Sequence, residues 1–198
     1  MTRSKRRYAV PRKKIDSAEF PKHNKIAITK LDAALRQLET AITLWFHDAD
    51  PVSIHVLAMS AHEVLRAINK SRAGKPMMLE DLNLIRPEYQ EALSELFVRH
   101  YQFFKHGTRD PQGTTWFAPQ VNQAVILDAV EAYSQIASQI TPLFRTFITY
   151  LSVHHPEYFQ NIRGHVSITA DLRSLSKSQF FVECLPVSFR FGFDIKPR

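Results

Sequence analysis

The sequence predicts an all-α protein: an up-and-down bundle of four to five helices, with a basic N-terminal arm and a short, partly extended C-terminal tail. Apolar residues recur at steps of three and four along several segments, which indicates amphipathic helices. The 198 residues include only five glycines. Apolar residues make up 44% of the chain, enough to bury a hydrophobic core.

Proline and glycine residues mark the expected boundaries of the predicted helices. A first helix is expected over residues 28–45, and a second begins at Pro51. Asp50 is the predicted N-cap of the second helix, because its carboxylate can accept from a backbone N–H that the helix leaves unpaired. Proline suits the first helical position because it lacks only a donor without an intrahelical partner. Gly74 is expected to stop this helix.

The later helices follow similar signals. A third helix is predicted between Pro87 and Gly107, and a fourth over residues 120–139. Pro142 either kinks the fourth helix or opens a fifth. Pro156 marks the end of the bundle.

The C-terminal tail has a weaker pattern. Residues 167–178 indicate a short helix or loop, and residues 180–193 alternate loosely and suggest an extended strand. We therefore divide the chain into a flexible basic arm (1–25), a helical bundle (26–160) and a C-terminal extension (161–198).

The formal net charge of +7 is concentrated in the arm. The arm holds nine basic side chains: Arg3, Lys5, Arg6, Arg7, Arg12, Lys13, Lys14, Lys22 and Lys25. It holds two acidic residues, and the rest of the chain is neutral. Such an arm either binds nucleic acid through phosphate charge, with the residues from Arg3 to Lys14 as contacts, or acts as a solubilising tail.

Composition also argues against several classes of protein. Cys184 is the only cysteine, so an intramolecular disulfide and a metal site built on a cysteine pair are both excluded. We interpret it as a small buried hydrophobic residue. No signal-peptide pattern opens the sequence and no apolar run is long enough for a membrane span, so we expect a cytoplasmic protein without membrane contact. No cofactor and no metal are expected.

The third predicted helix carries the most specific pattern. Arg99 and His106 are seven positions apart, which places them on nearly the same helix face with ~10.5 Å of rise between them. A guanidinium suits phosphate, and an imidazole exchanges a proton near neutral pH. His100 lies beside Arg99 and is expected to orient it or to contact substrate. These groups fit the cleavage of a phosphodiester by its own 2′-hydroxyl.

Arg99-His100, five further residues and His106 resemble the motif of the HEPN superfamily, helical proteins that pair as dimers. The mark of that family is an arginine, often followed by Asn, Asp or His, then four to six residues and a histidine. The resemblance covers roughly residues 28–155. It implies metal-independent endoribonuclease activity of the toxin or phage-defence type, in a homodimer that binds RNA and has a cognate antitoxin or partner protein. It also covers members that have lost activity and act only as partners.

Other residues admit two interpretations. Arg99 either acts in catalysis or pairs with Glu95, and His106 either acts in catalysis or caps the helix C-terminus. His55 and His62 lie on one face of the second helix, too far apart to bind one metal ion. That face is expected to form a polar seam toward the third helix, in which His62 or Glu63 supports Arg99.

Two aromatic pairs and the histidine pair His154-His155 can also be interpreted from the sequence. Trp45-Phe46 and Trp116-Phe117 are interpreted as core or dimer-interface aromatics, with base stacking as the alternative. His154 and His155, at a helix end, are expected to be exposed. Three functional hypotheses remain: a ribonuclease, a non-catalytic helical interaction protein, or a nucleic-acid tether whose bundle serves dimerisation.

Overall fold

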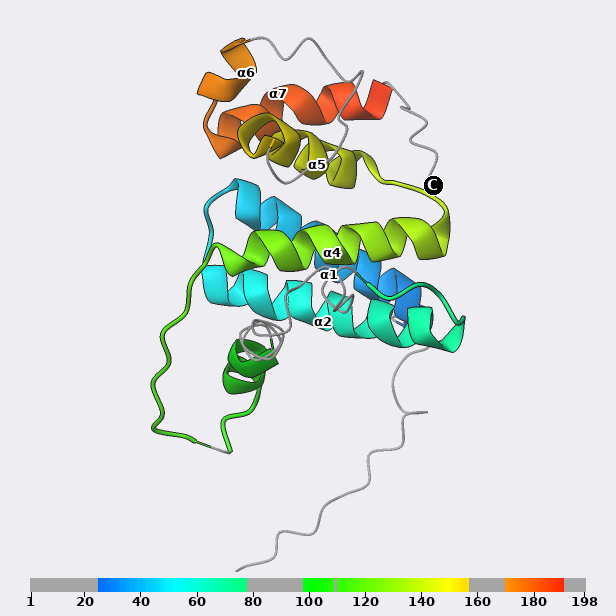
Figure 1. Cartoon of the computed structure of the whole chain (residues 1–198), viewed down its shortest axis with the longest axis vertical. Helices are drawn as coiled ribbons and strands as arrows, with labels where there is room; N and C mark the ends of the chain where they lie inside the picture. Colours follow the sequence, from blue (N-terminus) through cyan, green and yellow to red (C-terminus); the bar gives the residue numbers. More distant parts are fainter. Residues whose placement is uncertain (1–24, 78–97, 109, 157–169, 191–198) are drawn as a thin grey trace, which may run out of the picture.

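The computed structural model describes residues 25–77, 98–108, 110–156 and 170–190, and within them every regular element is helical (Figure 1). The all-α class predicted from sequence is confirmed. The elements are α1 (Lys30–Phe46), α2 (Pro51–Ser71), α4 (Val121–Ala137), α5 (Pro142–His154), α6 (Ala170–Ser174) and α7 (Lys177–Arg190). A further helical segment spans residues 98–105.

Several predictions from the sequence concern residues outside the described ranges. These are the arm over 1–24, with all of its proposed nucleic-acid contacts, and the start of the third helix with Glu95.

No described helix has the combination of length and apolar character that crossing a membrane requires.

Local capping signals determine where helices begin. The Asp50 carboxylate accepts a hydrogen bond from the Ser53 backbone N–H at 2.7 Å, as its predicted N-cap role requires. Pro142 opens a new helix rather than kinking the fourth. The Thr141 hydroxyl caps this helix by accepting from the Phe144 N–H at 3.2 Å. Both helices therefore start with the same pair of signals, a side-chain acceptor followed by proline.

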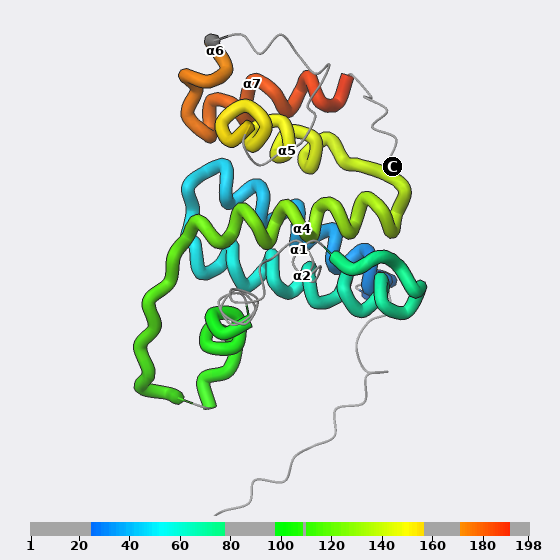
Figure 2. Tube along the Cα trace, in the orientation of Figure 1, coloured from blue at the N-terminus to red at the C-terminus, as the bar shows by residue number. Residues whose placement is uncertain are grey.

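Helices α2 and α4 are direct neighbours that run in the same direction. Near their N-terminal ends His55 contacts Asn122, and near their C-terminal ends Arg72 donates to the Ile136 carbonyl. Figure 2 shows both tubes running from left to right, with α1 antiparallel to α2. The simplest up-and-down bundle places such parallel helices diagonally, whereas here they pack directly.

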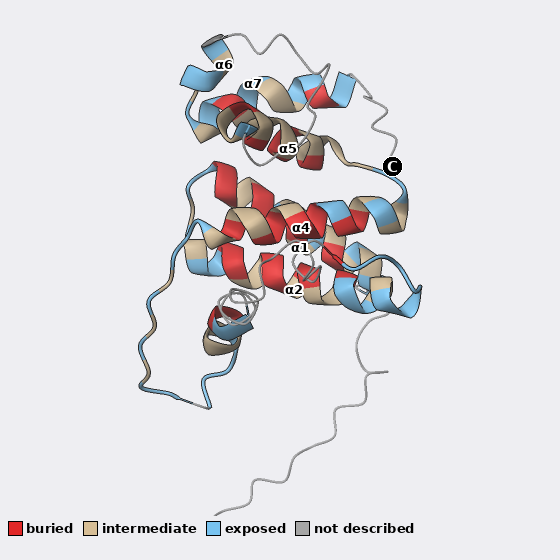
Figure 3. Cartoon of the chain, viewed as in Figure 1, coloured by how far each residue is buried: buried red, intermediate tan, exposed pale blue. Residues whose placement is uncertain are grey.

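The buried side chains gather where α1, α2 and α4 face one another (Figure 3). They are mostly aliphatic and include Leu38, Ile42, Ala58, Leu65, Val125, Ile126 and Ala129. A second layer, α5 with α7, is attached to the end of α1 through aromatic rings. Trp45 lies 5.1 Å from the rings of both Phe147 and Tyr150, and Phe46 lies 4.9 Å from that of Phe181. Trp45 and Phe46 are thus core aromatics, as expected.

The expectation of an extended C-terminal tail was wrong for residues 180–190, which belong to α7. Phe180 is fully buried, and its ring packs 5.1 Å from that of Tyr150 on α5. Packing of Phe180 against α5 stabilises the helix, because tertiary contacts outweigh the weak alternation of apolar and polar residues in this segment. Residues 170–174 form a short helix, one of the two alternatives considered.

Candidate functional site

The segment 98–105 has an exposed side and a packed side. Successive helical residues rotate by about 100°, so Arg99 and His106 share one face. His100 and Tyr101, about 100° and 200° further round the helix than Arg99, lie on the packed side, and they are 4% and 2% exposed. Arg99 and His106 are both exposed. The two motif residues therefore point away from the packed side of their helix.

His100 is turned toward the bundle interior rather than toward the motif face. Its Nε2 donates to the Trp116 carbonyl at 2.8 Å, because a carbonyl oxygen can only accept. The rings around it are those of His55, Phe104 and Phe117, with centroids between 5.1 and 6.3 Å away. His100 follows Arg99 in the sequence, but their side chains point in different directions, because neighbouring helical residues do not face each other. The described contacts of His100 thus join the motif helix to the following loop.

His62 faces α4. Its Nε2 lies 2.7 Å from an Asp128 carboxylate oxygen, and the two side chains are 9% and 1% exposed. The sequence predicted that His62 or Glu63 supports Arg99, and it did not identify Asp128 as the partner of His62. The signal available in the sequence was an acidic residue within the apolar run of residues 125–130. The pair fixes α2 against α4.

Glu63 lies closer to the motif helix, next to Lys105. Its carboxylate is 3.9 Å from the Lys105 Nζ, and both side chains are partly exposed. The same Nζ donates to the Tyr101 hydroxyl at 3.0 Å. That hydrogen bond, aided by Glu63, raises the pKa of Lys105. A protonated amine therefore lies one residue before His106.

The polar seam expected on α2 exists, and much of it is buried. His55 is fully buried and donates through Nδ1 to the Asn122 side-chain oxygen at 2.9 Å. Asn122 in turn donates to the Pro51 carbonyl at 3.0 Å. These contacts tie the start of α2 to the start of α4. The sequence pattern located the histidines but not their partners on α4.

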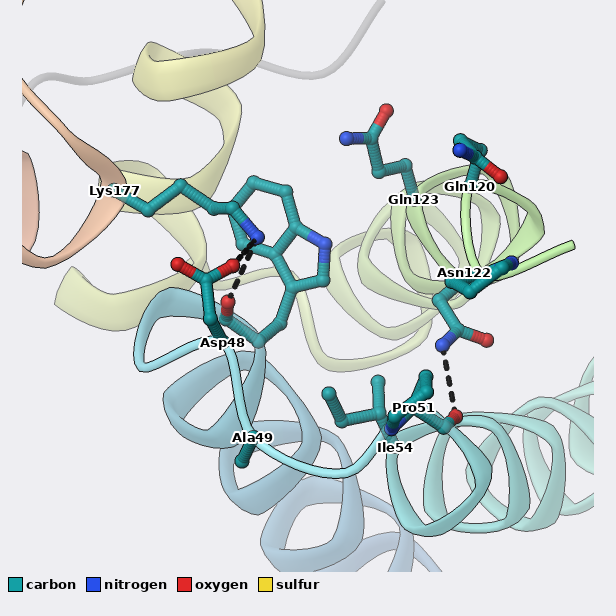
Figure 4. Close-up of a pocket in the computed structure, with 10 residues that line it drawn as sticks. Asp48, Ala49, Pro51, Ile54, Gln120, Asn122, Gln123 and Lys177 are labelled. Atoms are coloured by element: carbon teal, nitrogen blue, oxygen red, sulfur yellow. Dashed lines mark hydrogen bonds and ion pairs between the residues drawn. The ribbon is translucent and has the colours of Figure 1, made fainter.

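A cavity of about 310 Å³ lies where the α1–α2 turn, the start of α4 and the start of α7 meet (Figure 4). Lys177 is its only basic lining residue, and Figure 4 shows its amine directed at the Asp48 carboxylate. The Lys177 amine also lies 4.5 Å from the centre of the Trp45 ring. The Lys177 amine is thus already paired with protein groups, which makes this cavity a poor site for an anion. Neither Arg99 nor His106 lines it.

Among the described residues, no three His, Cys, Asp or Glu side chains are grouped as metal ligands would be. Cys184 is half-buried, and burial, with a contribution from Glu183, raises the pKa of its thiol to about 11. A thiol of this kind is a weak nucleophile because only the thiolate attacks.

Comparison with protein-family models, with curated proteins and with solved structures gives no significant match. A function for this chain therefore has to be inferred from the positions of its residues.

Proposed function

We propose that the protein is a metal-independent endoribonuclease in which Arg99 and His106 carry the chemistry. The observation that supports this proposal is the exposure of both residues, Arg99 on segment 98–105 and His106 directly after it. A catalytic pair has to reach a phosphodiester, whereas a purely structural pair is normally covered by protein. The buried histidines His55, His62 and His100 show what covered positions look like in this fold.

The proposed reaction uses the 2′-hydroxyl of the RNA as nucleophile. A general base removes the hydroxyl proton, and the freed oxygen attacks the adjacent phosphorus. The bond from phosphorus to the 5′-oxygen breaks, and a general acid protonates that leaving oxygen. The products are a 2′,3′-cyclic phosphate and a 5′-hydroxyl. His106 acts as base or acid, and Arg99 stabilises the additional negative charge on the phosphorane.

A homodimer would give this outward face a cleft. Two copies related by a twofold axis bring the same surface together from both sides, so two Arg99–His106 faces meet. One His106 then acts as base and the other as acid. Sedimentation at micromolar concentration should give twice 22.9 kDa. A monomer under these conditions would contradict the shared cleft.

The decisive experiment compares Arg99→Ala and His106→Ala with two matched controls. Arg36→Ala removes an exposed arginine of α1, and His47→Ala removes an exposed histidine that also follows a helix C-terminus. Loss of a proton-transfer group should reduce RNA cleavage ~10²–10⁴-fold, while melting temperatures stay close to wild type. Both controls should cleave normally.

Cleavage should also persist in a chelator and should leave cyclic phosphate ends. If the folded wild-type protein cleaves no RNA across a broad panel, the ribonuclease proposal is wrong. Cleavage by both motif variants at the wild-type rate would also be incompatible with it.

The exposed apolar residues of α7 favour a second candidate function, that of a non-catalytic helical interaction protein. Val182 and Phe189 are each 69% exposed, and Val187 is 48% exposed. Apolar surface of this kind on one helix is common at protein interfaces. The two candidates differ in the effect of His106→Ala, which changes no activity in an interaction protein.

A further inference from the structure

Trp116 is the most exposed large apolar side chain among the described residues, with 94% of its surface accessible. It lies in the loop between segment 98–105 and α4. The only other tryptophan, Trp45, is 5% exposed and packs in the aromatic core. Burying an indole stabilises a fold, so a fully exposed one contributes little to folding.

The backbone that carries this ring is held firmly. His100 Nε2 donates to the Trp116 carbonyl, and the following residue, Phe117, places its ring 5.0 Å from His55 and 5.3 Å from Phe104. The loop is thus fastened at Trp116 and directly after it. An exposed ring on a fastened backbone loses little conformational entropy when a ligand packs against it.

Its surroundings favour a planar ligand over a protein surface. Within the described loop residues 110–120, Trp116 is the only exposed large apolar side chain, because the ring of Phe117 packs against His55 and Phe104. Protein interfaces need a contiguous apolar core, which a single ring does not supply. A nucleobase needs only one aromatic face, and base–aromatic stacking tolerates any base.

The neighbouring helix supplies positive charge. His100, which holds the Trp116 carbonyl, belongs to the same helical segment as Arg99 and Lys105, and His106 follows at its end. Basic side chains and an exposed aromatic ring are the usual elements of a single-strand binding surface: the basic side chains attract the phosphates and the ring stacks with a base.

We propose that Trp116 is a stacking platform for an unpaired nucleobase of single-stranded RNA bound at the Arg99–His106 face. This inference rests on the proposed function and specifies its substrate class. Bases in a duplex are already stacked on their neighbours, so single strands and loops are the substrates and paired stems are excluded. His100 is a positioning residue that sets the loop relative to the motif helix.

The test uses the full chain and an eight-nucleotide single-stranded DNA, which lacks the 2′-hydroxyl and therefore cannot be cleaved. Tryptophan fluorescence reports on Trp116, because Trp45 is shielded. Titration should quench the wild-type signal saturably and leave Trp116→Phe, which retains only Trp45, nearly unchanged. The affinity of Trp116→Ala, measured by anisotropy of labelled DNA, should fall between about 5-fold and 150-fold.

Phe189→Ala is the matched control, because it removes another exposed aromatic ring from a distant helix and should bind as wild type does. Trp116→Phe should retain part of the affinity, since phenylalanine also stacks. A blunt duplex of the same length should bind without quenching. Unchanged affinity in Trp116→Ala overturns the proposal. If that variant also loses the dimer, the ring is a protein contact instead.

Failure of this inference can be distinguished from failure of the proposed function. If Arg99→Ala and His106→Ala abolish cleavage while Trp116→Ala leaves DNA affinity and the KM for RNA unchanged, the stacking platform is wrong and the nuclease stands. If the wild type cleaves nothing but quenching and affinity depend on Trp116, the platform stands and the nuclease is wrong.

Discussion

His62 of α2 and Asp128 of α4 meet at 2.7 Å in the interior, although they are 66 positions apart in the sequence. The contact joins two parallel helices whose remaining shared surface is largely apolar. A polar pair of this kind fixes the register of the two helices, because a shift along either axis would leave a buried polar group unpaired.

Removing one member of this pair should therefore be costly. We expect Asp128→Ala to lower the free energy of unfolding by about 3–5 kcal/mol, a large part of the total for a domain of this size. Asp128→Asn keeps an acceptor oxygen and should lose less. Urea denaturation measures both, with Asp171→Ala, an exposed carboxylate on α6, as control. Equal stability of wild type and Asp128→Ala would contradict the proposed role of the pair.

The basic arm should act on nucleic-acid affinity rather than on stability. We expect deletion of residues 1–24 to leave the melting temperature nearly unchanged, because this basic segment carries little apolar surface to bury. Affinity for RNA should fall, and the slope of its logarithm against the logarithm of salt concentration should flatten by several units. Binding measured between low and moderate salt checks this. An unfolded truncation, or an unchanged slope, would contradict the division into arm and body.

His154 should make the protein less stable in mild acid. Its ring stacks on Tyr150 with centroids 4.1 Å apart, and it is partly covered rather than exposed as the sequence suggested. Burial, then the positive charges of His155 and Arg173, lower the pKa of His154. The unfolded chain gains this proton at a higher pH than the folded chain, so the stability contribution is complete above about pH 6.5 and declines below it.

We expect His154→Phe, which keeps a ring for stacking, to lose less stability than wild type between pH 7 and pH 5. Urea denaturation across this range measures the difference. His47→Phe replaces an exposed histidine and should follow the wild-type pH profile. A His154→Phe profile parallel to that of wild type would show that His154 does not contribute.

Cys184 should alkylate slowly while the protein is folded. With its thiol pKa raised to about 11 by burial, about one thiol in a thousand is ionised at pH 8. An unperturbed cysteine is far more ionised at this pH, so unfolding in urea should accelerate reaction with iodoacetamide by on the order of a hundredfold. Mass spectrometry of timed samples measures both rates. Equal rates in the two states would contradict a shielded thiol.

The sequence predicted the features that depend on local chemistry. Asp50 with Pro51 and Pro142 each mark a helix start that the structure contains, because capping and proline geometry act within a few residues. Features that depend on tertiary contacts could not be predicted from the sequence in the same way. The helical form of α7 depends on burial of Phe180 against α5.

The same limit applies to the candidate site. His100 was expected to orient Arg99 or to contact substrate, and in the structure its ring contacts the Trp116 carbonyl and the surrounding aromatic rings. Its orientation depends on a loop that returns to the helix, and no short-range pattern encodes that return. The exposure of Trp116 has the same origin, since the half-buried Phe117 next to it makes the ring contacts with His55, His100 and Phe104.

The parallel packing of α2 and α4 also constrains how the chain reaches its native state. The α1–α2 hairpin is closed by a short turn, so it can form early and locally. Helix α4 docks on α2 in the same direction only after the long connection between them has returned to the starting end of α2. Such sequence-distant pairing raises contact order and slows the folding of an otherwise helical protein. During synthesis, the apolar side of the hairpin that α4 covers remains open until the ribosome has released α4.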